Sequence, residues 1–82
     1  MNKKQYVLVD VKGNKFHYAD AELTILHRED GPSIEFARGG EMWHRNDKFH
    51  REDGPAITWA NGDTEWWVDG KRVRSKRSKS LS

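Results

Sequence analysis

The sequence predicts an all-β fold, an antiparallel meander of repeated β-hairpins with a period of 23 residues and a disordered basic C-terminal tail. Three observations support this prediction. The hexapeptide His-Arg-Glu-Asp-Gly-Pro occurs at residues 27–32 and again at 50–55, and matching residues continue downstream at the same spacing. Short β-branched and aromatic segments alternate with turn signals that contain Gly and Asn. Helical patterning is weak and limited to residues 19–27.

The repeat divides the chain into units. Ile34 in the first good copy matches Ile57 in the second, and Gly13 precedes the matching Gly39 by 26 residues, which indicates an earlier, degenerate copy. Terminal units of repeat proteins are often atypical because they cap the array. We therefore expect one domain over residues 1–74, with a degenerate unit at about 1–26 and good units at 27–49 and 50–74, followed by a flexible basic tail at 75–82.

Each unit reads as hairpin strands separated by turns. The expected strands are residues 6–11, 15–18, 33–37, 41–45, 56–60 and 64–68. The expected turns are at residues 13–14, 38–40, 46–47, 61–62 and 69–70. Asn61-Gly62 is the strongest of these turn signals because both residues tolerate a positive φ.

The hexapeptide itself predicts a structural hinge in each unit. Its proline fixes φ, and its aspartate is expected to bond backbone amides two residues ahead. Its arginine is expected to pair with a carboxylate of the neighbouring unit, and its histidine to close the same network. The residues assigned to this structural turn are His27, Arg28, Asp30, Gly31, Pro32, His50, Arg51, Asp53, Gly54 and Pro55.

Four aromatic residues repeat in register and are assigned to the core, namely Phe36, Trp43, Trp59 and Trp66. Trp67 then lies on the opposite face, because neighbours in a strand alternate. An exposed Trp beside Arg and His is typical of a protein-binding hot spot. The alternative is that Trp67 packs under the N-terminal strand or at a contact between copies. The candidate contact residues are Trp67, His44, Tyr18, Arg45, Lys71, Arg72, Arg74, Lys76 and Arg77.

The net charge of +2 is unevenly distributed. Residues 1–70 carry a net charge of −4, and residues 71–82 carry six basic residues and no acidic one. Such a tail is suited to nucleic-acid phosphates or an acidic protein, or it folds back on the acidic body.

The residue types argue against catalysis. The chain has no cysteine, and it lacks the nucleophile elbow, phosphate-binding glycine loop and His-Glu-x-x-His motifs. One histidine and one carboxylate per unit fall short of the three or four protein ligands of a zinc site. We therefore expect no catalytic residues, no metal and no cofactor. No apolar run is long enough to span a membrane. The first five residues lack an apolar secretory segment, so a cytoplasmic location is expected.

The two hexapeptides resemble the HREDGPA-type repeats of small bacteriophage and large DNA-virus proteins, and they are distantly similar to MORN-type hairpin repeats. The resemblance covers about residues 27–74. Ser33 departs from the usual alanine, which Ala56 retains, and the motif lapses after Lys71 as in a terminal cap. The resemblance implies a phage protein expressed in a host cell. Phage proteins of this size often bind and block host machinery, for example a defence system in the manner of an anti-CRISPR protein.

These observations predict a non-enzymatic protein that binds, and inhibits, a host protein through an aromatic sheet surface. A nucleic-acid binder that uses the basic tail is one alternative, and a phage structural or assembly component is another. The two open edges of a meander also make a homodimer an option.

Overall fold

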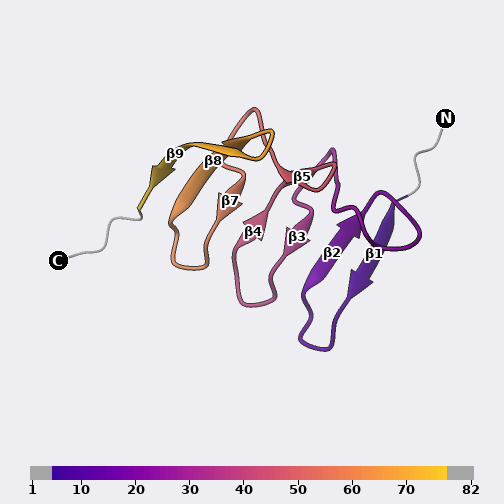
Figure 1. Cartoon of the computed structure of the whole chain (residues 1–82). Coiled ribbons are helices and arrows are strands. Elements are labelled where there is room, and N and C mark those ends of the chain that lie inside the picture. Colours follow the sequence, from indigo (N-terminus) through magenta and orange to yellow (C-terminus); the bar gives the residue numbers. More distant parts are fainter. Residues whose placement is uncertain (1–4, 78–82) are drawn as a thin grey trace.

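The computed structural model describes residues 5–77, and within that range it contains nine strands and no helix (Figure 1). The predicted all-β meander is confirmed. The strands are β1 (Tyr6–Val9), β2 (Lys15–Tyr18), β3 (Ile34–Glu35), β4 (Glu41–Met42), β5 (His44–Arg45), β6 (Lys48–Phe49), β7 (Ile57–Thr58), β8 (Thr64–Val68) and β9 (Lys71–Lys76). With no helix in the described range, there is also no candidate there for a membrane-spanning helix.

Seven strands form one antiparallel sheet in the order β1-β2-β3-β4-β7-β8-β9, and β5 pairs with β6 in a separate two-stranded sheet. Figure 1 shows β1 at one edge of the larger sheet and β9 at the other. The β5–β6 hairpin occupies the position in its unit that the second half of β8 and β9 occupy in the next. A bulge between Trp66 and Trp67 separates the two halves of β8.

Three similar turns lie at one end of the sheet. In each, a glycine N–H donates to the carbonyl three residues earlier, which closes a tight turn. The glycine alone takes a positive φ, because Asn61 is absent from the residues with positive φ and Gly62 has a φ of 94°. Both residues of the strong Asn-Gly signal were expected to tolerate this region, but only the glycine uses it. The three turns are Asp10–Gly13, Phe36–Gly39 and Trp59–Gly62.

Adjacent turns stack through a glycine and an alanine. A Cβ added to Gly13 would lie 3.4 Å from Cβ of Ala37, and one added to Gly39 would lie 3.7 Å from Cβ of Ala60. The missing side chain in one unit therefore accommodates the methyl group of the next. Between the first two turns, Oδ1 of Asn14 also accepts the backbone N–H of Ala37 at 2.8 Å.

At the opposite end of the sheet, two of the predicted turns are confirmed as two-residue turns with positive φ at both positions. The values are 50° and 71° at Asn46 and Asp47, and 50° and 83° at Asp69 and Gly70, as in type I′ hairpins. In the first unit a longer loop, residues 19–25, takes the place of this turn. Its backbone is held by the carboxylate of Asp20, which accepts bonds from the next residues.

The buried interior is narrow and unusually polar. The buried apolar side chains are those of Ile34, Ala56 and Ile57, and the buried polar ones are those of His17, Ser33, His44 and His50. The assignment of four aromatic residues to this core was wrong in part. Trp59 is 43% exposed, and the other three are only half-buried. Trp59 and Phe36 are first residues of turns, so they lie beyond the last strand pair and no further strand covers them.

The C-terminal strand reaches further than the expected domain boundary at residue 74. Ser75 pairs with Glu65 and Lys76 with Thr64, so both belong to β9. The guanidinium of Arg74 lies 4.8 Å from the centroid of the Trp66 ring, which stabilises this strand by a cation–π contact. The remaining residues of the predicted tail, 78–82, lie outside the described residues.

Candidate functional site

Each hexapeptide histidine connects a β-turn to a glutamate. Nδ1 of His27 accepts the backbone N–H of Asn46 at 2.9 Å, and Nδ1 of His50 accepts that of Asp69 at 3.0 Å. Because Nδ1 is the acceptor, the ring proton lies on Nε2. Nε2 lies 3.3 Å and 3.2 Å, respectively, from the carboxylate of the glutamate two residues ahead. Both ring nitrogens of these histidines are therefore used to hold the turn of the following hairpin.

The hexapeptide arginines pack on a ring of the preceding unit. The guanidinium of Arg51 lies 3.8 Å from the centroid of the Trp43 ring, and Nη1 of Arg28 lies 3.1 Å from Nε2 of His17. His17 and Trp43 are equivalent, since the backbone carbonyl of each accepts the N–H of the next hexapeptide histidine. The arginine thus connects units through a ring, whereas a carboxylate of the neighbouring unit was expected.

The same arginines organise their own hexapeptide. Nε donates to the aspartate two residues ahead, at 3.2 Å in the first copy and 3.0 Å in the second. Nη1 donates to the carbonyl of the proline four residues ahead, at 3.1 Å and 3.2 Å. The expectation that the aspartates bond backbone amides ahead is replaced by this Arg–Asp pair. The arginine side chain is the longer donor and reaches the carboxylate across the turn.

The hexapeptide glycine makes room for the arginine. A Cβ on Gly31 would lie 2.9 Å from Cζ of Arg28, and one on Gly54 would lie 2.9 Å from Cζ of Arg51. The guanidinium is therefore placed between the glycine backbone and the ring of the preceding unit. Close approach explains why glycine occupies this position.

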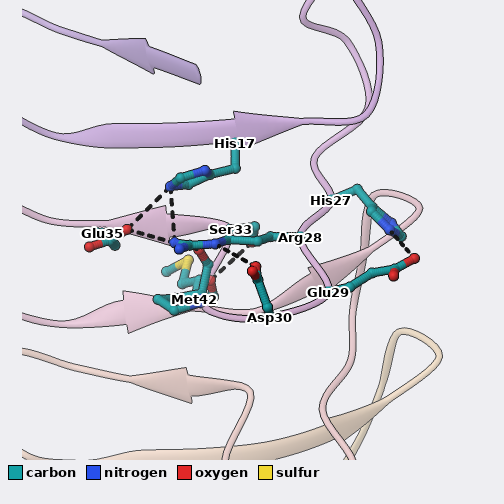
Figure 2. Close-up of polar contacts among 9 residues, drawn as sticks. His17, His27, Arg28, Glu29, Asp30, Ser33, Glu35 and Met42 are labelled. Atoms are coloured by element: carbon teal, nitrogen blue, oxygen red, sulfur yellow. Dashed lines mark hydrogen bonds and ion pairs between the residues drawn. The ribbon is translucent and has the colours of Figure 1, made fainter. Parts of the chain in front are cut away.

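The first copy carries an additional ion pair that the second lacks (Figure 2). Oε2 of Glu35 accepts Nη1 of Arg28 at 2.9 Å and lies 3.2 Å from Nε2 of His17. Burial would raise the pKa of Glu35, but the hydrogen bonds from His17 and Arg28 and the positive charge of Arg28 lower it below its ordinary value. The equivalent position in the second copy is Thr58, and there Arg51 rests on Trp43 alone.

The two hexapeptides face a polar groove of about 350 Å³, the motif groove, lined by Arg28, Glu29, Asp30, Trp43, His44, Arg45, His50, Arg51, Glu52 and Asp53. Its charged groups pair with one another, as in the contact between Arg45 and Glu52 at 3.8 Å. Within residues 5–77, no group of three or more His, Asp or Glu side chains is placed to share a metal ion. The chemistry of the motif groove is that of a cross-linked hinge.

The residues predicted to contact a partner are placed differently from one another. His44 is buried and is corrected as a contact residue, because its ring stacks on Phe49 with centroids 4.5 Å apart. Trp67 lies against the same Phe49 ring at 5.0 Å, is half-buried, and donates Nε1–H to Glu65 at 2.9 Å. Tyr18 is also half-buried. The exposed members of the predicted set are Arg45, Lys71, Arg72, Arg74, Lys76 and Arg77.

A larger groove lies at the end of the sheet that carries the three stacked turns. This turn-end groove has a volume of about 640 Å³ and is lined by Lys12, Asn14, Phe36, Ala37, Arg38, Gly39, Gly40, Thr58, Trp59 and Ala60. Its walls are the two turn rings, and its floor is formed by small residues. Sequence analysis missed it because Phe36 and Trp59 were assigned to the core. Their place directly before a turn was the available signal.

The turn-end groove is apolar with a positive rim. Its lining includes two cations, Lys12 and Arg38, and no carboxylate. Nε1–H of Trp59 donates to Oε2 of Glu65 at 2.8 Å, which fixes the orientation of the exposed ring. A ring held in place loses little rotational freedom on binding, so the groove is preorganised for an apolar side chain. The cations on its rim favour a ligand with negative charge.

Comparisons of the chain with protein-family models, with curated proteins and with solved structures found no match.

Proposed function

We propose that the protein is a non-enzymatic binding module that captures an extended segment of a host protein in the turn-end groove and thereby inhibits or redirects that protein. The observation that carries the proposal is the 43% exposed ring of Trp59 beside Phe36 in a groove whose charged lining residues are all cations. The host as the source of the partner follows from the resemblance to phage repeats.

The groove chemistry supports a partner segment with one large apolar side chain and nearby acidic residues. Trp59 and Phe36 supply the ring contacts that dominate the energy of many interfaces. Lys12 and Arg38 supply the complementary charge for carboxylates. The glycines and alanines of the floor allow the backbone of an extended chain to approach closely.

A protein partner is favoured over nucleic acid at this site. Residues 1–70 carry a net charge of −4, which repels a phosphate backbone that would extend beyond the two groove cations. A short acidic peptide segment needs only the local charge of the rim.

The proposal is tested by affinity capture from host extract, followed by titration of the purified captured protein. Trp59→Ala and Arg38→Glu should each abolish specific capture and weaken the titrated affinity, with the far-UV spectrum unchanged. Val73→Ala is the matched control, because Val73 is also exposed, at 63%, but lies on β9 away from the groove. Trp67→Ala tests the surface that the sequence favoured.

Loss of capture in Trp67→Ala with full capture in Trp59→Ala would reject the turn-end groove and return the contact to the opposite surface. Equal capture by all variants would reject both surfaces.

A second candidate function is nucleic-acid binding by β9. Its cations Lys71, Arg72, Arg74 and Lys76 are all exposed on one edge of the sheet. Removing this strand would disturb the pairing of β8, so a charge-neutral variant is the better test. Replacing Lys71, Arg72 and Lys76 together by Gln, while Arg74 stays on Trp66, should abolish a salt-sensitive gel shift. Binding that persists in this variant would contradict this candidate.

A further inference from the structure

The strand β1 presents an apolar, unpaired edge. It lies at the end of the strand order and pairs only with β2 among the described residues. Val7, Leu8 and Val9 are 50%, 42% and 55% exposed. An edge strand of this kind normally carries charges, a proline or a cover that prevents pairing with another chain. Residues 6–9 have neither a charge nor a proline.

The pairing of β1 with β2 determines which backbone groups face outward. Asp10 donates its N–H to Asn14, which makes these two residues a hydrogen-bonded pair. Hydrogen-bonded and non-hydrogen-bonded pairs alternate along an antiparallel ladder. Leu8 is therefore bonded to β2, and the N–H and C=O groups of Val7 and Val9 point to the free edge. The donation from His17, opposite Val7, to the carbonyl of Ser33 beside β3 agrees with this alternation.

The two edges of the sheet differ in charge. The opposite edge, β9, exposes four cations on six residues, so two copies that met through β9 would repel one another. Pairing of β9 with β1 of another copy would place those cations against apolar side chains and strip their water. Only β1 is compatible with itself, because a neutral strand meets a neutral strand.

We propose that the protein forms a symmetric dimer through antiparallel pairing of β1 with β1 of a second copy. The outward groups fix the register, with Val7 of one copy opposite Val9 of the other and the two Leu8 residues facing each other across the twofold axis. Each Val7–Val9 pair exchanges both backbone bonds, and the Leu8 pair takes the closer, non-hydrogen-bonded spacing. The two sheets then continue into one, with a cationic β9 at each outer edge that stops further growth.

The test is sedimentation equilibrium of the full chain across the micromolar range, with proline scanning of the two edges. Val7→Pro removes an N–H that points outward, so the strand keeps its bonds to β2 while the dimer loses one bond per copy of Val7. Ser75→Pro is the matched control, because Ser75 lies opposite Glu65, whose carbonyl bonds Ala56 next to β7, and its own N–H therefore also points outward. Val9→Lys adds a charge to the β1 edge without changing the backbone.

We expect the unmodified chain and Ser75→Pro to sediment as dimers, and Val7→Pro and Val9→Lys to weaken the association by about tenfold or more. Circular dichroism checks that each variant is folded. A monomeric unmodified chain at the highest concentration would overturn the proposal. So would dimers that survive both β1 variants, or long polymers that Ser75→Pro dissolves, since those would require β9. None of these outcomes depends on the turn-end groove, so the dimer and the binding function fail independently.

Discussion

Oγ of Ser33 and Nδ1 of His44 lie 2.6 Å apart, and both side chains are buried. The hydroxyl donates its proton to the carbonyl of Met42 at 3.0 Å, so Nδ1–H of His44 is the donor to Oγ. Twenty-three residues later the same two positions are Ala56 and Trp67. The serine that departs from the repeat is therefore matched to a histidine that departs from it as well. One polar pair replaces one apolar pair.

The Ser33–His44 pair predicts a non-additive mutational cycle. Ser33→Ala leaves a buried ring N–H without an acceptor and should lower the free energy of unfolding by about 1–3 kcal/mol. Adding His44→Trp recreates the residue pair of the second copy and should recover most of that loss. Urea unfolding followed by tryptophan fluorescence and circular dichroism measures both values.

The control for this cycle is His44→Trp alone. It forces an indole against the retained hydroxyl of Ser33, so it should destabilise the chain more than the same substitution does in the Ser33→Ala background. A coupling energy near zero would show that the two positions are independent.

Gly54 predicts a second cycle. In Gly54→Ala the new methyl group meets the Arg51 guanidinium at 2.9 Å and displaces it from the Trp43 ring, which should cost about 1–3 kcal/mol of stability. In an Arg51→Ala background the same substitution meets no guanidinium, so its additional cost should nearly vanish. The free energy of unfolding of the four variants decides this, and a full cost in both backgrounds would mean that the glycine is needed for another reason.

The two hexapeptide histidines should differ in their contribution to stability. His50→Ala leaves the N–H of Asp69 without its acceptor at a side chain only 6% exposed, and we expect a loss of about 1–3 kcal/mol. His27→Ala makes the equivalent change at a side chain 18% exposed, where water replaces part of the bond, so its loss should be smaller. Hydrogen exchange at the two turns reports each loss separately. The reverse order would contradict the role of burial.

Stability should fall in two steps as the pH is lowered. Burial lowers the pKa of His44 below 6.5, with the charge of Asp47 opposing it, so the unfolded chain binds a proton there before the folded chain does. Stability is thus complete above about pH 6.5 and declines below it. Glu35 stays ionised in the folded chain below its ordinary pKa of 4.5, so its contribution is lost as the pH falls through that region and below. Unfolding measured from about pH 8 to about pH 3 should show both declines.

The variant that combines Ser33→Ala with His44→Trp is the control for the pH experiment. Its first decline should be reduced, because the buried histidine is gone, and its second should remain. An unchanged first decline would assign that step to the other histidines.

The strand and turn pattern could be predicted from the residues alone, because those features depend on local chemistry. Gly39 and Gly62 mark turns through their backbone freedom, and Asn46-Asp47 and Asp69-Gly70 tolerate the positive φ of two-residue hairpins. The hexapeptide spacing of 23 residues likewise predicted equivalent contacts, since Arg28 and Arg51 bond the same relative positions. The lapse after Lys71 still keeps an arginine at position 74, in contact with Trp66.

Which side chains are covered depends instead on how the units stack. Alternation along a strand separates two faces but does not say which face other strands bury. His44 is buried because Phe49 and Ser33 close around it, and Trp59 is exposed because the chain turns immediately after it. The turn-end groove exists because stacking brings Lys12, Phe36 and Trp59 from three turns to one end of the sheet, a proximity that no single segment of the sequence encodes.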